Sequence, residues 1–169
     1  MTNFWNKKHV LVTGGLGFIG GHLVEELLES GANVSVLDNV SNPSSRKGKN
    51  LPKNITVVRG ECKDATVAQR ACKNIDIVMH LAARVAGVDY NRQHKGTMLS
   101  ENLLIQTVML EAAQQAGAER FLAVSSAVVY PVDAMMPTPE TEGFRGEPDD
   151  VNGGYGWAKR VNELLARYY

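Results

Sequence analysis

Three polar side chains in the last third of the chain have the residue types needed for proton transfer at a hydroxyl group. Tyr155 and Lys159 are four residues apart at the start of a helical pattern, Tyr155–Tyr169, so they share one helix face. A Lys ammonium beside a phenol favours the phenolate and lowers its pKa, which suits Tyr155 to act as a general base. Ser126 follows a strand pattern, Arg120–Ser125, where its hydroxyl can hold the reacting oxygen. These residues predict a catalytic site; the alternative is an ordinary exposed helix start.

Three glycines near the N-terminus are spaced for binding a pyrophosphate. Gly14, Gly17 and Gly20 lie between a short strand pattern, His9–Thr13, and a helical pattern, Phe18–Ser30. The first glycine permits a tight turn, the second a close approach of backbone to phosphate, and the third close packing of helix on sheet. The N–H groups and the dipole at the helix N-terminus favour an anion there. The alternative is a turn without a ligand.

A carboxylate after the second strand pattern bears on the choice of cofactor. Asp38 follows Asn33–Leu37 at the distance expected for a side chain that binds the ribose diol of a dinucleotide. A carboxylate at this place repels a 2′-phosphate, so NAD is the predicted cofactor. Arg46 and Lys47 lie in the next loop and keep NADP possible. A loop-capping role for Asp38 is the alternative.

Composition excludes several other classes of protein. The 169 residues suit one domain, and 18 basic and 18 acidic side chains cancel, so no nucleic-acid partner is expected. No apolar run approaches the roughly 18 residues of a membrane span, and we expect no membrane partner. Two cysteines make no disulfide framework, so a cytoplasmic location is predicted. His22 and His94 lack ligands at useful spacing, and no metal site is expected.

Strand and helix patterns alternate along the chain. This alternation predicts an α/β fold, a doubly wound parallel (Rossmann) sheet that binds ligands at the carboxyl ends of its strands. Such a domain usually continues with a further strand, so residues 1–169 are expected to be an NAD(P)-binding domain, the N-terminal part of a longer enzyme truncated before its substrate domain. Pro131–Gly154 has no clear period, and Ser41–Pro52 reads as a loop. The remaining strands are expected at Ile55–Arg59 and Ile75–Leu81, and the remaining helices at Ala65–Cys72 and Met98–Ala116.

Together these motifs resemble the extended short-chain dehydrogenase/reductase family, and within it the NAD-dependent epimerase/dehydratase group. The resemblance implies that Glu61 and Cys62 lie beside the adenine, although the family more often carries Asp than Glu at the first position. It places the backbone of Leu81–Ala83 along the cofactor and gives Lys159 a second role on the nicotinamide ribose. The motifs are Thr13–Gly20, Asp38–Asn39, Gly60–Asp64, His80–Ala83, Ser125–Tyr130 and Tyr155–Lys159. The implied cofactor-binding residues are Gly14, Gly17, Phe18, Ile19, Gly20, Asp38, Asn39, Glu61, Cys62, Leu81, Ala82, Ala83 and Lys159.

The resemblance also implies a nucleotide-sugar substrate and limits which reactions of the family are expected. Dehydratases of this group carry acidic side chains after the active-site serine, where this chain has the apolar Ala127 and Val128. The segments 83–88 and 102–113 resemble GDP-fucose synthase and GDP-mannose 3,5-epimerase, whose proton-transferring Cys is replaced here by Val128. The expected reaction is therefore epimerisation or reduction through a 4-keto sugar, catalysed by Ser126, Tyr155 and Lys159.

Two other functions stay open from the sequence. One is a dinucleotide-binding protein without catalysis, or an inactive fragment; the other is a reductase of a non-sugar carbonyl. The family resemblance further implies a homodimer that pairs the helices Met98–Ala116 and Tyr155–Tyr169.

Overall fold

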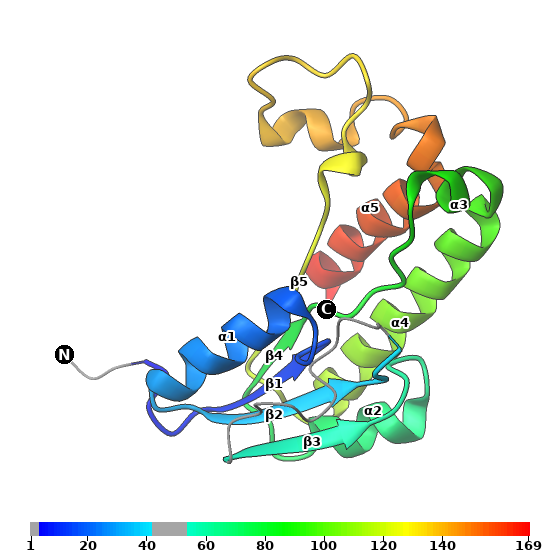
Figure 1. Cartoon of the computed structure of the whole chain (residues 1–169). Coiled ribbons are helices and arrows are strands. Elements are labelled where there is room, and N and C mark those ends of the chain that lie inside the picture. Colours follow the sequence, from blue (N-terminus) through cyan, green and yellow to red (C-terminus); the bar gives the residue numbers. More distant parts are fainter. Residues whose placement is uncertain (1–3, 42–53) are drawn as a thin grey trace. The chain divides into compact units, whose positions relative to one another are not determined.

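The structure is a computed structural model that describes residues 4–41 and 54–169 (Figure 1). Strands and helices alternate through most of this part of the chain. The strands are β1 (His9–Thr13), β2 (Asn33–Asp38), β3 (Ile55–Arg59), β4 (Ile77–His80) and β5 (Arg120–Ala123). The α-helices are α1 (Phe18–Glu29), α2 (Ala65–Cys72), α3 (Val88–Gln93), α4 (Lys95–Gln115) and α5 (Gly153–Tyr168), and the 3-10 helices are η1 (Ala127–Val129), η2 (Glu140–Phe144) and η3 (Asp150–Asn152).

The strands form one sheet in the order β3-β2-β1-β4-β5. The pairs β1–β2, β2–β3 and β1–β4 are parallel, and Thr13 at the end of β1 lies opposite His80 at the end of β4. The chain moves from β1 outward to β3 and then returns to the other side of β1. This reversal makes the carboxyl ends of β1 and β4 a topological switch point, the usual ligand site of such sheets. The predicted doubly wound Rossmann fold is confirmed.

Helices cover both faces of the sheet, as right-handed crossovers require. In Figure 1, α1 lies over one face, while α2 and the C-terminal part of α4 lie on the other. A hydrogen bond of 3.3 Å from Gln69 to Gln115 joins α2 to the end of α4. No helix of the described ranges is both long enough and apolar enough to cross a membrane.

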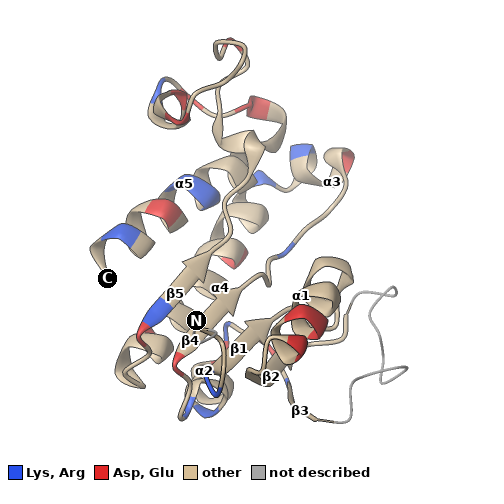
Figure 2. Ribbon diagram, turned by 90° about the vertical axis from the view of Figure 1, so that its left-hand side faces the viewer, with Lys and Arg blue, Asp and Glu red and all other residues tan. Residues whose placement is uncertain are grey.

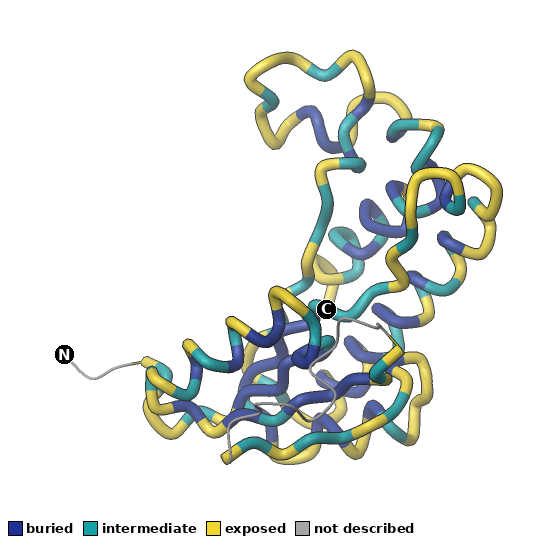
Figure 3. Tube along the Cα trace, viewed as in Figure 1, coloured by how far each residue is buried: buried dark blue, intermediate teal, exposed yellow. Residues whose placement is uncertain are grey.

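The core lies between α1 and the central strands, which Figure 3 shows buried along most of their length. Both faces of a parallel sheet are covered, so its strands are apolar almost throughout. Val24 and Leu27 of α1 pack on side chains from three neighbouring strands. The buried members of this cluster are Val10, Val12, Leu16, Val24, Leu27, Ala32, Val34, Val36, Ile77 and Met79.

Contacts divide the chain into two compact units. The first comprises the residues up to 82 together with 108–122, and the second comprises 83–107 with 123–169. The first unit contains the glycine turn and nearly all of the sheet, whereas the second contains α3, the start of α4, the 3-10 helices and α5. The predicted cofactor turn and the predicted catalytic residues therefore belong to different units.

Several predicted element boundaries differ from the structure. The strand expected at Ile75–Leu81 is β4, which is shorter, and the segment Pro131–Gly154 contains two 3-10 helices and the start of α5. Helix α3 was not predicted because its six residues are too few to show a helical period. The expected loop Ser41–Pro52 lies, apart from Ser41, outside the described residues, as do Arg46 and Lys47.

The packing of α1 on the turn after β1 leads to a testable prediction. A methyl group on Gly20 would lie 2.2 Å from the carbonyl oxygen of Gly14, so Gly20→Ala must push the helix away from the turn. We expect a loss of about 1–3 kcal/mol in the free energy of unfolding, measured by urea denaturation. The matched control is Gly96→Ala in α4, where the methyl group meets nothing within 4 Å and should not destabilise. Equal stability of the two variants would contradict the packing argument.

Candidate active site and cofactor site

The glycine turn lies at the switch point of the sheet and leaves no room for side chains. Gly14 has a φ of +68°, and a Cβ there would lie 3.3 Å from the backbone of Ala82, which follows β4. Its N–H bonds to the carbonyl of Leu37 at 2.8 Å, and its own carbonyl accepts from the N–H of Gly17 at 3.0 Å. The backbones of β1, β2 and the segment after β4 thus converge where the sequence predicts the pyrophosphate.

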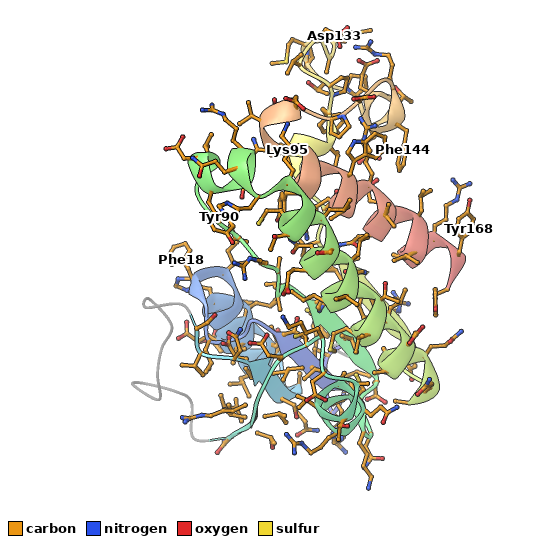
Figure 4. The ribbon with its side chains drawn as sticks, turned by 90° about the vertical axis from the view of Figure 1, so that its right-hand side faces the viewer. Phe18, Tyr90, Lys95, Asp133, Phe144 and Tyr168 are labelled. Atoms are coloured by element: carbon orange, nitrogen blue, oxygen red, sulfur yellow. The ribbon has the colours of Figure 1, made fainter. Side chains whose placement is uncertain are left out.

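The first turn of α1 has the properties of an anion site. Gly17 is the N-cap residue, and no side chain among the described residues caps this helix. The first N–H groups of an α-helix have no partner within the helix, so those of α1 are available to a phosphate. Phe18 and Ile19 are 80% and 70% exposed, and Figure 4 shows Phe18 at the tip of this turn. Their apolar side chains are thereby available to cover a bound ligand.

Asp38 is buried at the end of β2, and both of its carboxylate oxygens accept backbone hydrogen bonds. Oδ2 accepts from the N–H of Leu16 at 3.0 Å, and Oδ1 accepts from the N–H of Val40 at 2.7 Å. Asp38 therefore stabilises the glycine turn through Leu16. Its bond to Val40 also caps the start of the next loop, which is the alternative role stated for Asp38 from the sequence. Each oxygen of a carboxylate has two lone pairs, so a ribose diol can still bind to it.

Three further residues of the predicted cofactor site are gathered beside the ends of β2 and β3. Asn39 donates from Nδ2 to Oε1 of Glu61 at 3.0 Å. Cys62 is buried, and burial together with the neighbouring Glu61 raises the pKa of its thiol to about 12. Cys62 is therefore a neutral thiol at physiological pH, suited to packing rather than to nucleophilic chemistry.

Thr13 begins the Thr13–Gly20 motif, but the sequence did not predict a role for its side chain at the switch point. Its side chain is fully buried, and Oγ1 accepts from the N–H of Ala82 at 3.0 Å and lies 2.8 Å from Nδ1 of His80. Thr13 thus joins the end of β1 to the segment after β4 that is predicted to run along the cofactor. The signal in the sequence was a polar residue that ends an apolar strand directly before the glycine turn. Leu81 and Ala82 belong to the first unit, whereas Ala83 begins the second.

In the second unit, helix α5 carries Tyr155 and Lys159 and contacts the segment that contains Ser126. Lys159 is buried, and Nζ donates to the carbonyl of Val124 at 2.6 Å. Ser125 donates from Oγ to Oε1 of Glu163, one turn further along α5. Ser126 is the N-cap residue of η1, and its Oγ accepts from the N–H of Val128. The serine segment is therefore fixed on the same helix as the predicted base.

Burial shifts the pKa values of both α5 residues. Desolvation lowers the pKa of Lys159 to about 8, so the ammonium remains mostly protonated at pH 7. Its Nζ lies 5.5 Å from the centroid of the Tyr155 ring. The sequence interpretation expected the ammonium to lower the pKa of the phenol, but in the chain alone desolvation raises it. That expectation is wrong for the chain without cofactor, because burial removes the phenolate from water and thereby raises the pKa of the phenol.

Two glycines flanking Tyr155 allow α5 to approach its neighbours closely. A Cβ on Gly154 would lie 2.0 Å from the carbonyl oxygen of Lys95, at the start of α4. A Cβ on Gly156 would lie 2.7 Å from the carbonyl oxygen of Val128 in η1. Backbone contacts on both sides therefore fix the position of Tyr155 along α5 and its separation from the serine segment. The sequence interpretation did not single out these glycines, because their role depends on distant partners.

The glycine turn at the switch point, with a carboxylate at the end of β2, defines the class of dinucleotide-binding Rossmann proteins. The Tyr155–Lys159 pair and Ser126 have the pattern of short-chain dehydrogenases/reductases. The family model described as NAD dependent epimerase/dehydratase family matches residues 10–169, and the chain belongs to this family. The predicted family is confirmed, and its dependence on NAD agrees with the predicted cofactor.

Similar proteins include enzymes of nucleotide sugars. A UDP-glucose 4-epimerase of Erwinia amylovora is 34% identical over 95% of this chain and 48% of its own length. A GDP-mannose 3,5-epimerase 1 of Oryza sativa subsp. indica is 27% identical over 98% of this chain and 44% of its own length. The structure of the Thermus thermophilus UDP-glucose 4-epimerase in complex with NAD has a TM-score of 0.81 and 32% identity, covering 95% of this chain and 50% of that chain. The chain spans about half the length of the curated relatives it matches.

Thr13 provides a test of the switch-point geometry. Thr13→Val keeps the shape of the side chain but leaves the part-buried N–H of Ala82 without its acceptor. Such a loss costs about 1–3 kcal/mol, and we expect weaker binding of NAD by about tenfold in isothermal titration calorimetry. Thr13→Ser retains the hydroxyl and is expected to bind like the wild type. If Thr13→Val binds NAD equally well, the hydroxyl has no part in shaping the site.

The lowered pKa of Lys159 predicts a pH-dependent stability. Between pH 8 and 9 the folded chain loses the Lys159 proton, whereas the unfolded chain keeps it up to the ordinary pKa of 10.5. The unfolded state then binds more protons, so the free energy of unfolding rises with pH by about 1 kcal/mol over this interval. Lys159→Met lacks this contribution, and the difference between the two proteins cancels the opposing contributions of Cys62 and Cys72. A difference that stays constant from pH 7 to 9 in urea denaturation would show that burial does not lower the pKa.

Proposed function

We propose that the chain provides the NAD-binding and catalytic residues of a nucleotide-sugar 4-epimerase. One observation carries this proposal: helix α5, which bears Tyr155 and Lys159, holds the segment that contains Ser126. The residues directly after Ser126, in η1, have apolar side chains. A dehydratase or a multi-centre epimerase needs a further proton-transferring group, and Ala127 and Val128 offer none. Similarity to UDP-glucose 4-epimerases supports a UDP-sugar as the substrate.

The first unit is suited to hold the dinucleotide. The space at Gly14 and Gly20 is closed to side chains but leaves the N–H groups of α1 to the pyrophosphate. Asp38 lies at the end of β2 for the ribose diol, and its negative charge favours NAD over NADP. NAD held by these residues would supply the acceptor and later the donor of the hydride at the sugar carbon.

The side chains of the second unit supply the proton chemistry. Tyr155, as phenolate, is proposed to accept the proton of the C4 hydroxyl, and the Ser126 hydroxyl to hold the same oxygen. The Lys159 ammonium stabilises the phenolate, and the positive charge of an oxidised nicotinamide acts in the same direction. Both effects oppose the desolvation that raises the pKa of Tyr155 in the chain alone. When the hydride would return to the opposite face of C4, Tyr155 would give the proton back to the same oxygen, and the product would be the C4 epimer.

Two further predictions belong to this proposal. A homodimer through α4 and α5 is supported by exposed apolar side chains, among them Leu104 and Trp157. A cytoplasmic location is supported by the low cysteine content alone. A dinucleotide-binding protein without turnover, or an inactive fragment, is the alternative to catalysis.

The proposed reaction is tested by mixing the chain with NAD and UDP-galactose. We expect NADH absorbance in a single turnover and UDP-glucose as the product. Tyr155→Phe should reduce the rate by about 10²–10⁴-fold, because it removes a general base. Tyr168→Phe, on the exposed end of the same helix, serves as the control and should leave the rate unchanged. A chain that binds NAD but forms neither NADH nor product would favour the alternative without catalysis.

A further inference from the structure

Arg160, directly after the predicted catalytic lysine, is a buried charge of unusual environment. Its side chain is 2% exposed, and among the described residues it is the largest fully buried side chain. The guanidinium donates three hydrogen bonds: Nε and Nη2 to the carbonyl of Val129 at 2.9 and 2.6 Å, and Nη1 to the carbonyl of Gly146 at 2.6 Å. Burying a charge is costly unless hydrogen bonds compensate, so losing these hydrogen bonds would destabilise the folded chain.

The two carbonyls belong to the two ends of one loop. We call residues 130–145 the proline-rich loop; Val129 precedes it and Gly146 follows it. One guanidinium therefore joins the beginning of the loop to its end, and both to α5. Two aromatic rings complete the site: that of Trp157, from α5, lies 5.1 Å from the guanidinium carbon, and that of Phe144, from the loop, lies 5.8 Å away.

The proline-rich loop is also braced internally. Arg145 donates to Oε2 of Glu142 at 2.8 Å and to both carboxylate oxygens of Asp133. Glu142 in turn accepts from the N–H of Met135. Figure 4 shows Asp133 and Phe144 on this loop. The loop is thus organised by its own side chains, and Arg160 ties its two ends together.

The same guanidinium acts on the serine segment. Lys159 donates to the carbonyl of Val124, and Gly156 lies close to the carbonyl of Val128; both carbonyls precede the proline-rich loop in the sequence. Arg160 donates to the carbonyl of Val129, the last residue of η1. Of the three α5 residues Gly156, Lys159 and Arg160, it is the one that also bonds to Gly146, after the end of the loop. Figure 2 shows the basic and acidic residues that alternate along α5, the helix from which these contacts arise. Ser126 is therefore fixed between the contacts at residue 124 and at residue 129.

We infer that Arg160 is a positioning residue, which clamps the two ends of the proline-rich loop and thereby holds Ser126 in register with Tyr155 and Lys159. The planar fork of a guanidinium reaches two carbonyls in fixed directions, which a lysine ammonium cannot reproduce. The inference rests on the proposed function, because it assigns Arg160 a role in the chemistry of those three residues.

Hydrogen exchange of the whole chain, followed by mass spectrometry, tests the clamp without requiring turnover. In Arg160→Gln we expect exchange in the proline-rich loop, residues 130–145, to be faster by about tenfold or more, since each hydrogen bond from a charged group contributes roughly that factor. Exchange in β1, β2 and α1 should not change, and neither should the affinity for NAD measured by calorimetry. Arg160→Lys keeps the charge but not the fork, and it should behave like Arg160→Gln.

Three outcomes of this experiment would overturn the inference. The first is unchanged exchange in the loop of Arg160→Gln, and the second is full protection in Arg160→Lys, which would make charge alone sufficient. The third is faster exchange along the entire chain together with loss of NAD binding, which would make Arg160 a general stabilising residue. Arg167→Gln, an exposed position on the same helix, is the matched control and should exchange like the wild type.

Kinetics separate positioning from loop anchoring. With UDP-galactose, Arg160→Gln is expected to lower kcat by about tenfold or more while the affinity for NAD stays constant, because misplaced catalytic groups lose rate rather than cofactor binding. A higher KM with unchanged kcat would show that Arg160 serves only substrate binding by the loop. It would refute the proposal that Arg160 positions Ser126 relative to Tyr155 and Lys159. If the wild type has no turnover, the alternative without catalysis is favoured, while the exchange experiment still decides the clamp.

Discussion

The central constraint in this protein is the close approach of backbones at the carboxyl ends of β1 and β4. Gly14 and Gly20 have no space for a side chain there, and Thr13 joins the two strand ends through a buried hydroxyl. Because the backbones are this close, the N-terminus of α1 is aimed at the switch point and Asp38 can brace the turn from β2. The apolar packing of α1 on the sheet stabilises this arrangement, and the cofactor chemistry proposed here depends on it.

A similar principle governs the second unit, where α5 organises the predicted catalytic residues. Gly154 and Gly156 let the helix approach α4 and η1, while Lys159 and Arg160 bind carbonyls before and after Ser126. Buried cations are costly, and here each is compensated by backbone oxygens rather than by an acidic partner at bonding distance. The segment that carries the serine is therefore positioned by bonds to its main chain, together with the Ser125 side chain that bonds to Glu163.

Family membership and local chemistry support the function at different levels. The match to NAD-dependent epimerases/dehydratases covers residues 10–169, whereas the curated relatives are about twice as long as the chain. The family accounts for the dinucleotide site and for the Tyr155–Lys159 pair. The argument against dehydration and multi-centre epimerisation depends instead on Ala127 and Val128, which cannot transfer protons, and the proposal of a 4-epimerase rather than a reductase depends on similarity to UDP-glucose 4-epimerases.

The sequence by itself determined the features that depend on local geometry. The spacing of Gly14 and Gly20 between a strand and a helix, and of Tyr155 and Lys159 on one helix face, follows from the periods of those elements. The parallel sheet also followed from alternating patterns. Short elements such as α3 could not be predicted, because six residues do not establish a period.

Tertiary structure alone decided the contacts between distant residues. Thr13 meets Ala82, 69 residues away, and Arg160 meets Val129, 31 residues away, so neither role leaves a local pattern. The pKa shifts of Tyr155 and Lys159 also could not be predicted from the sequence. The spacing of the two residues indicated an attraction between ammonium and phenolate, but only the folded chain shows how completely each is removed from water, and desolvation outweighs that attraction.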